Sequence, residues 1–184
     1  MSRIQIETLG KSFDGRHVLQ NISLTLEPGR SLALIGPTAA GKTVLLKCLV
    51  GLYAPDQGTI RIDGADVTSP DMRAETLDDR IGMLFQQNAL FDSLSVWENI
   101  GFRLMARGST RAAARARAEE LLPQVGLPIE TADLFPADLS GGMQKRVGFA
   151  RAIATAPDIL LLDNPTAGLD PILAARIDAM ISSL

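Results

Sequence analysis

Residues 36–43, with the sequence Gly-Pro-Thr-Ala-Ala-Gly-Lys-Thr, have the residue types and spacing of a phosphate-binding loop. Backbone N–H groups of such a loop, and of a helix that follows it, can point at a polyphosphate. Lys42 would bring a positive charge to the β- and γ-phosphates, and Thr43 would bring an oxygen to Mg²⁺. Taken alone, the segment could also be a glycine-bounded turn with a solvated lysine. Its place between an apolar run and a helix-like run favours the phosphate loop.

Two later segments carry residues that could complete such a site. Residues 159–162 form an apolar run that ends at Asp163, where a carboxylate at the edge of a sheet can hold Mg²⁺ through water. The sequence Leu-Ser-Gly-Gly at 139–142 opens a helix-like run and predicts a second anion site, distinct from the first. A core strand that ends in Asp, and a simple helix cap, are the alternatives for each segment by itself. Residues 168–171 (Gly-Leu-Asp-Pro) follow Asp163. Because all these segments occur in this order in one chain, the alternatives are disfavoured for the segments taken together.

The apolar periodicity predicts the elements that position these residues. Alternating runs at 3–8, 22–26 and 58–63 indicate a half-exposed antiparallel sheet, and near-continuous apolar runs at 31–35, 81–85 and 158–162 indicate buried strands. Helices are expected at 42–50, 96–107, 110–125, 142–156 and from Pro171, with Thr110 as an N-cap and Pro123 near the end of its helix. The pattern predicts an α/β core joined to a β-rich part and a helical insertion.

Composition limits the classes of function. The chain has 184 residues, 46% of them hydrophobic and 21% charged, with a net charge of -3. These values are typical of a globular protein and disfavour a nucleic-acid partner or direct adhesion to anionic lipids. The one cysteine, Cys48, excludes a disulfide framework and fits the reducing cytosol. Because neither a signal peptide nor an apolar stretch of membrane-spanning length is found, we expect any link to a membrane to run through a protein partner.

With these motifs in order, the sequence resembles the nucleotide-binding subunits of ABC transporters over essentially its whole length. The resemblance identifies 36–43 as the Walker A loop, Gln86 as the Q-loop glutamine, 139–142 as the signature, Asp163 as the end of the Walker B strand and 168–170 as the D-loop. It implies a P-loop NTPase (RecA-like) core with an antiparallel β subdomain and an inserted α-helical subdomain. The implied division is 1–86, 87–156 and 157–184, with the C-terminal part of the usual domain absent.

The resemblance also implies ATP and Mg²⁺ as cofactors and assigns roles to individual residues. Lys42, Gln86 and Asn164 would take part in catalysis, and Thr43, Gln86 and Asp163 would hold the metal. Phe13 would stack on adenine, although an exposed or core Phe is an equal interpretation of the residue alone. The implied nucleotide contacts are Phe13, Gly36, Pro37, Thr38, Ala39, Ala40, Gly41, Lys42, Thr43, Val44, Ser140, Gly141, Gly142 and Asp170.

The partners implied are a second copy of the subunit and integral membrane permease subunits, which would hold the protein at the inner face of the cell membrane. Each ATP would lie between the phosphate loop of one copy and residues 140–142 of the other. A groove beside residues 87–100 would receive a permease helix, with Phe91, Leu94 and Trp97 as contact or core residues. Residues 85–96 and Met143 look most like the ATPases of bacterial MCE-type phospholipid transporters, which implies lipid transport and an MCE-type lipid-binding protein. General importers stay open as an alternative.

The sequence departs from the family pattern at several positions. Asn164 stands where a glutamate normally orients the attacking water, and an amide cannot accept a proton. Ala39 and Val44 replace a loop glycine and a hydroxyl residue. The chain ends at Leu184 before the strand that carries the family's switch histidine, so we expect a fragment or a short product, and His17 is interpreted as structural or solvated. These departures leave a second hypothesis, a regulatory subunit that binds ATP without efficient hydrolysis, and a less favoured third, a soluble ABC protein of translation or DNA repair.

Overall fold

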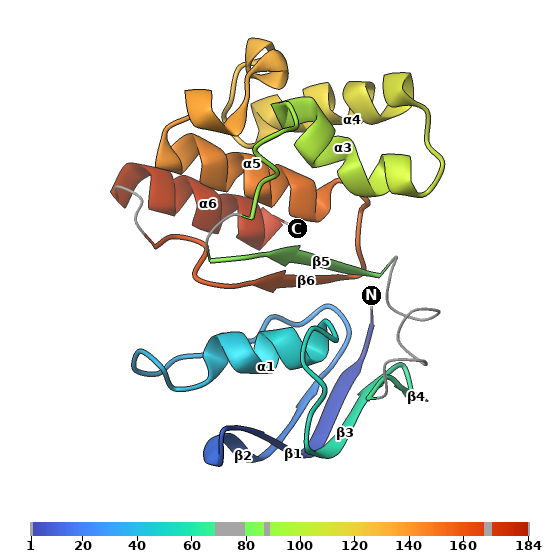
Figure 1. The fold of residues 1–184 in the computed structure, drawn as a ribbon, viewed down its shortest axis with the longest axis vertical. Coiled ribbons are helices and arrows are strands. Elements are labelled where there is room, and N and C mark those ends of the chain that lie inside the picture. Colours follow the sequence, from blue (N-terminus) through green and yellow to red (C-terminus); the bar gives the residue numbers. More distant parts are fainter. Residues whose placement is uncertain (1, 69–79, 87–88, 168–170, 184) are drawn as a thin grey trace. The chain divides into compact units, whose positions relative to one another are not determined.

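The computed structural model describes residues 2–68, 80–86, 89–167 and 171–183. The chain divides into two compact units, Met1–Ile81 and Gly82–Leu184, and each is described by itself. Among the described residues, the N-terminal unit contains a sheet and helix α1, and the C-terminal unit contains the other helices and a strand pair (Figure 1). The division into 1–86, 87–156 and 157–184 stays a prediction.

The sheet of the N-terminal unit is antiparallel, with the order β2-β1-β3-β4. Its strands are β1 (Ile4–Phe13), β2 (Arg16–Leu26), β3 (Gln57–Ile62) and β4 (Ala65–Asp66). β1 is central, because Ile6 pairs with Leu24 on one side and with Ile60 on the other. Alternate residues of β1 and β3 are buried, as period-2 patterning requires. The half-exposed antiparallel sheet predicted from the sequence is confirmed.

Short turns with positive φ close the two hairpins of this sheet. Asp14 and Gly15 join β1 to β2 with φ of 49° and 77°, and Asp63 and Gly64 join β3 to β4 with φ of 51° and 83°. An Asp-Gly pair suits such turns because both central residues must adopt φ above zero. The turns therefore fix the pairing of their strands.

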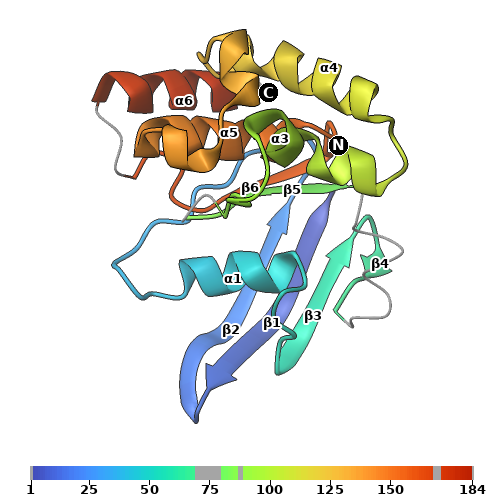
Figure 2. The ribbon, with the colours of Figure 1, turned by 45° about the horizontal axis from the view of Figure 1, so that its top comes forward.

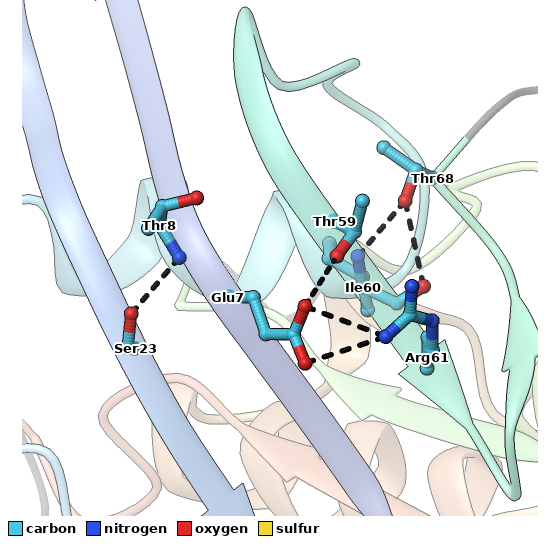
Figure 3. A network of polar contacts seen from close by, with 7 residues as sticks. All are labelled: Glu7, Thr8, Ser23, Thr59, Ile60, Arg61 and Thr68. Atoms are coloured by element: carbon cyan, nitrogen blue, oxygen red, sulfur yellow. Dashed lines mark hydrogen bonds and ion pairs between the residues drawn. The ribbon is translucent and has the colours of Figure 1, made fainter.

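Polar side chains link the strands across the exposed face of the sheet (Figure 3). The Glu7 carboxylate accepts hydrogen bonds from Arg61 Nη1 at 3.3 Å and from Thr59 Oγ1 at 3.5 Å. On the other side of β1, the Thr8 N–H donates to Ser23 Oγ at 2.9 Å. Exposed pairs of this kind contribute at most about 1 kcal/mol each. Their main effect is to specify which residues of β1, β2 and β3 face one another.

Helix α1 (Lys42–Leu49) lies across one face of this sheet in both ribbon views (Figures 1 and 2). It buries Leu45, Leu46, Cys48 and Leu49, and its first residue follows Gly41. Gly41 has a φ of 89°, and a Cβ there would lie 2.9 Å from Leu19 Cδ2. The positive φ at the start of α1 therefore favours glycine, and the approach of Leu19 leaves little room for a Cβ. The predicted helix is confirmed.

The prediction of a buried strand at residues 31–35 is wrong. The structure assigns no strand there, and Leu32 and Ile35 are 52% and 93% exposed. An apolar run forms a strand only where another strand offers backbone partners. Among the described residues, the backbone of 31–35 has no such partner. The apolar pattern identifies a hydrophobic segment, but it does not indicate whether another strand lies beside that segment to accept its backbone hydrogen bonds.

The C-terminal unit is built on the paired strands β5 (Ile81–Leu84) and β6 (Ile159–Leu162), and both predicted strands are confirmed. The helices are α3 (Val96–Ala106), α4 (Arg111–Gln124), α5 (Gly141–Ile153) and α6 (Pro171–Ser183), with 3-10 turns at Ile129–Asp133 and Pro136–Asp138. In both ribbon views these helices lie on the same side of the strand pair (Figures 1 and 2). Leu84, Ile100, Leu122, Val147 and Phe149 belong to the core of this unit.

Side-chain caps at Ser95 and Thr110 fix the first residues of α3 and α4. Ser95 and Glu98 form a capping box, in which the Ser95 N–H donates to Glu98 Oε2 at 3.0 Å. That hydrogen bond, followed by one from Arg111, holds the pKa of Glu98 below its ordinary value. Thr110 Oγ1 accepts a hydrogen bond from the Ala113 N–H at 3.2 Å, which confirms the predicted N-cap.

Helix α5 ends at Ile153, earlier than the predicted end at residue 156. Ala156 has a φ of 49° and precedes Pro157. A residue before proline is pushed out of the helical region, so the helix has to end before it. This correction matters because the end of α5 packs against β5.

Gly82 marks that contact between α5 and β5. A Cβ at Gly82 would lie 2.1 Å from the Ala152 carbonyl oxygen and 2.8 Å from Pro157 Cγ. We expect Gly82→Ala to lower the free energy of unfolding by about 3 kcal/mol, because overpacking forces the backbone apart. Denaturant unfolding can be followed through Trp97, the only tryptophan of the chain. Met83→Leu on the same strand is the control and should cost less than about 1.5 kcal/mol; equal costs would contradict the tight contact.

Candidate nucleotide-binding site

Residues 36–40 form an exposed loop, the buried Gly41 leads from it into α1, and Lys42 is the first residue of that helix. Lys42 Nζ turns back over the loop and donates to the carbonyl oxygens of Gly36 and Pro37, both at 2.7 Å. The first turn of α1 contains no acidic residue. The positive end of the helix dipole and the ammonium group therefore meet at one loop, which is an arrangement that favours an anion.

The loop holds Ala39 in a left-handed conformation, with a φ of 63°. Ala39 is the position where the family pattern has glycine, and an alanine in this region costs on the order of 1 kcal/mol. The following residue, Ala40, donates its N–H to the Pro37 carbonyl at 3.3 Å and has no positive φ. Thr38 lies in the same exposed turn, while Thr43 and Val44 are half-buried in the first turn of α1.

Phe13, predicted to stack on adenine, is the last residue of β1 and is 38% exposed. Its ring meets Tyr53 edge to face with the centroids 5.2 Å apart, and Lys11 Nζ lies 5.3 Å from its centroid. Part of the ring is thus open to a planar partner. Nearby, hydrogen bonds from Lys11 Nζ and then from the Ser12 N–H lower the pKa of Asp56.

His17 lies at the start of β2, and its Nδ1 is 2.8 Å from Ser12 Oγ. The histidine is exposed and links the two strands of the first hairpin. This placement agrees with the interpretation of His17 as structural or solvated.

Ser140 caps α5, and its Oγ accepts a hydrogen bond from the Met143 N–H at 3.3 Å. Gly141 and Gly142 are the first residues of the helix. A Cβ at Gly141 would meet no atom within 4 Å, and Gly141 has no positive φ. Packing within the described parts of the chain therefore does not require glycine at this position. The glycine leaves the N-terminus of α5 open to close approach from outside.

Asp163 directly follows β6 and is only 5% exposed. Its N–H donates to the Leu84 carbonyl at 3.0 Å, which holds it beside the end of β5. Gln86 lies two residues beyond β5 and is exposed. Gln86 and Asp163 thus both follow the ends of paired strands. Asp170 and the rest of the predicted D-loop lie outside the described residues.

Asn164 is exposed and adopts a left-handed conformation with a φ of 52°. Asparagine tolerates this region better than most residues, because its short side chain can hydrogen-bond locally. Lys145 Nζ donates to the Asn164 carbonyl at 2.8 Å and to the Ala167 carbonyl at 2.6 Å. The Ala167 N–H donates to the same Asn164 carbonyl at 3.2 Å. The segment after Asp163 is therefore fixed by backbone contacts.

Lys145 and a second anchor, Arg151, are not among the residues predicted from the sequence; Arg151 Nη1 donates to the Ala89 carbonyl at 2.7 Å. Both belong to α5. No local signal could have found them, because a lysine or arginine in a helix normally extends into water. Of the apolar candidates for a permease contact, Trp97 is buried under the guanidinium groups of Arg111 and Arg115 and belongs to the core.

The residues predicted to hold Mg²⁺ offer a hydroxyl, an amide oxygen and a carboxylate, from Thr43, Gln86 and Asp163. These hard oxygen donors fit Mg²⁺, which keeps several waters and takes few protein ligands when it is bound with phosphates. In the described parts of the chain, no group of three His, Cys, Asp or Glu side chains gathers as a metal site.

Comparison with known proteins agrees with these features. The family model described as ABC transporter matches residues 19–167. The arginine transport ATP-binding protein ArtM of Bacillus subtilis is 40% identical over 98% of this chain and 75% of its own length. The taurine import ATP-binding protein TauB of Pseudomonas aeruginosa is 38% identical over 100% of this chain and 68% of its own length.

Solved structures show the same fold. A dimeric, post-hydrolysis structure of the ATP-binding cassette MJ0796 with ADP and Pi superposes with a TM-score of 0.92 and 31% identity, over 98% of this chain and 82% of that one. The chain belongs to the ABC transporter family, has the fold of its ATPase cassettes and is an ATP-binding subunit. No helix among the described residues is long and apolar enough to cross a membrane.

The left-handed Ala39 gives a test of the loop geometry. Ala39→Gly should relieve strain, whereas Ala40→Gly should only add freedom to the unfolded chain. We expect the free energy of unfolding of Ala39→Gly to exceed that of Ala40→Gly by about 1 to 2 kcal/mol, measured by chemical denaturation. Two variants of equal stability would show that Ala39 is not strained.

Proposed function

We propose that this chain binds Mg·ATP on the loop at 36–43 and hydrolyses it, together with a second copy, to drive a membrane permease. The observation that carries the proposal is the meeting of Lys42, the open loop and the N-terminus of α1. Gly36 to Val44 would surround the phosphates, and Phe13 would stack on adenine. Thr43, Gln86 and Asp163 would hold Mg²⁺, which would neutralise charge on the phosphates.

The second copy would complete each site. The open N-terminus of α5, with Ser140, Gly141 and Gly142, can present backbone N–H groups to the phosphates of a nucleotide bound to the partner. Structures of the related MJ0796 cassette are dimeric, which supports the presence of a second copy. Contacts that exist only in the closed dimer would let ATP shift the equilibrium towards it, and loss of the γ-phosphate would release it. Asp170 is assigned to the same interface by resemblance.

The permease is proposed to contact an exposed aromatic pair, formed by Phe91 in the loop before α3 and Phe102 within α3. The rings of Phe91 and Phe102 lie 4.6 Å apart, and the two residues are 43% and 40% exposed. Asn99 is fully buried and bonds to the backbone at Phe91, Leu94 and Ser95, which fixes the loop that carries Phe91. Such a contact would place the chain peripherally at the cytoplasmic face of the membrane.

For the transported substrate we propose a small polar solute, because relatives are named for arginine and taurine transport. The phospholipid and the MCE-type partner predicted from residues 85–96 and Met143 find no support among these relatives and remain predictions. Purification of the chain with its permease from membranes, followed by mass spectrometry of the bound molecules, distinguishes the two. Co-purified phospholipid above the background of an unrelated permease would favour the lipid prediction.

The nucleotide site is tested by Lys42→Ala. Removing a charge-assisted contact to phosphate should weaken the binding of Mg·ATP about 10- to 100-fold, as measured by equilibrium titration. Lys47→Ala on the same helix is the matched control, because Lys47 lies in the last turn with its ammonium group 5.2 Å from the Tyr53 ring centroid. Equal affinities for the unmodified protein and Lys42→Ala would contradict the proposed function.

A regulatory subunit that binds ATP without efficient hydrolysis is the second candidate, and Asn164 is the observation that favours it. If this candidate is correct, Asn164→Glu in the full-length protein should raise phosphate release about 10²- to 10⁴-fold while leaving Mg·ATP affinity nearly constant. Asn164→Gln is the control, because it has the size of Glu, cannot accept a proton and shares the unfavourable left-handed backbone. Rapid release by the unmodified protein would rule the regulatory candidate out.

A further inference from the structure

The most unusual charged group of the C-terminal unit is Lys145, which is only 4% exposed although it carries an ammonium group. Lysines at the edge of a protein interior normally extend their charge into water. Lys145 instead ends between the carbonyl oxygens of Asn164 and Ala167, at 2.8 and 2.6 Å. Burial lowers the pKa of Lys145, and the charge of Asp163 acts in the opposite direction. A buried ammonium group is tolerated only where such partners compensate for lost hydration.

The partners of Lys145 belong to one functional segment. Asn164 directly follows Asp163, and its carbonyl accepts hydrogen bonds both from Lys145 Nζ and from the Ala167 N–H. The ammonium group therefore closes a turn whose own hydrogen bond already joins residues 164 and 167. Removing the lysine would take this donor from the carbonyl groups of Asn164 and Ala167, and only the hydrogen bond from the Ala167 N–H would still close the turn.

The other end of the lysine belongs to the helix that Ser140 caps. Lys145 lies five residues after Ser140 in the sequence, within α5, so the backbone between them is one continuous helix. Arg151, later in α5, holds the Ala89 carbonyl in the segment that follows Gln86. In contrast, Arg146 holds the Gly126 carbonyl at 2.7 Å, away from these segments. Neighbouring cations of one helix thus anchor different parts of the chain.

We infer that Lys145 is a positioning residue that ties the turn at 164–167 to the signature helix, so that Ser140 and Asn164 move as one body. The inference rests on the proposed function. In the proposed dimer, Ser140 serves the nucleotide of the partner copy, whereas Asn164 serves the nucleotide of its own copy. Lys145 would thereby make the position of Asn164 depend on whether Ser140 has engaged a nucleotide.

The test compares three variants in the full-length protein. Lys145→Gln removes the ammonium group, Lys145→Arg keeps a cation with several N–H donors, and Arg146→Gln is the matched control on the same helix. Hydrogen exchange reports the opening of the turn through the Ala167 amide. We expect exchange in 164–167 to rise about 10-fold or more in Lys145→Gln, to return to within about 3-fold of the unmodified protein in Lys145→Arg, and to stay unchanged in Arg146→Gln.

Steady-state phosphate release separates positioning from a purely structural role. Lys145→Gln should lower kcat about 10-fold and change KM for Mg·ATP less than about 2-fold, and Lys145→Arg should restore kcat, because an interaction acting after binding affects kcat. Unchanged exchange in Lys145→Gln would overturn the inference. Increased exchange without rescue by Lys145→Arg, or a kcat that stays constant, would also overturn it.

The proposed function can fail separately. If the unmodified protein binds no Mg·ATP, the proposed function is contradicted, and the exchange pattern of the variants still decides whether Lys145 fastens the turn. If the unmodified protein binds Mg·ATP but releases no phosphate, Mg·ATP-induced protection of 164–167 replaces kcat as the readout. Protection in the unmodified protein and Lys145→Arg, and its loss in Lys145→Gln, would then support the inference, and equal protection in all variants would overturn it.

Discussion

The segments that carry the candidate chemistry of the C-terminal unit depend on one constraint, the capture of backbone carbonyl groups by cations of α5. Loops that follow buried strands leave carbonyl groups that need donors. Lys145 supplies a donor to the turn after Asp163, and Arg151 supplies one to the segment after Gln86. Since Ser140 caps the same helix, α5 connects three segments that are far apart in the sequence.

In the N-terminal unit, the position of the phosphate loop follows from sterics rather than from charge. Gly41 is favoured by its positive φ, and the approach of Leu19 leaves little room for a Cβ where the loop enters α1. Lys42 then becomes the first helical residue and reaches back over the loop. Gly141 at the start of α5 is under neither requirement. This contrast supports a role for Gly141 that lies outside the chain's own packing.

Asn164 differs from the family pattern in its side chain and has a left-handed backbone conformation. The family pattern has a glutamate here, which accepts a proton, and the structure holds the residue in the left-handed region that asparagine tolerates. The backbone of this position therefore suits the amide that the sequence contains. Family membership establishes the fold and the class, an ATP-binding subunit of an ABC transporter. In the proposed function, the rate of hydrolysis depends on how this turn presents the Asn164 side chain.

The sequence by itself determined the alternating strands at 3–8, 22–26 and 58–63, the cap at Thr110, and the phosphate-loop motif at 36–43, because local periodicity and turn chemistry specify them. It failed at residues 31–35, where a strand needs a partner that no local pattern supplies, and at the end of α5. Only the tertiary structure showed that Lys145 is a buried anchor, that the half-buried Arg151 is a second one, and that Trp97 belongs to the core. The physical reason is that burial and carbonyl capture depend on which distant segments meet, whereas capping and alternation depend only on neighbouring residues.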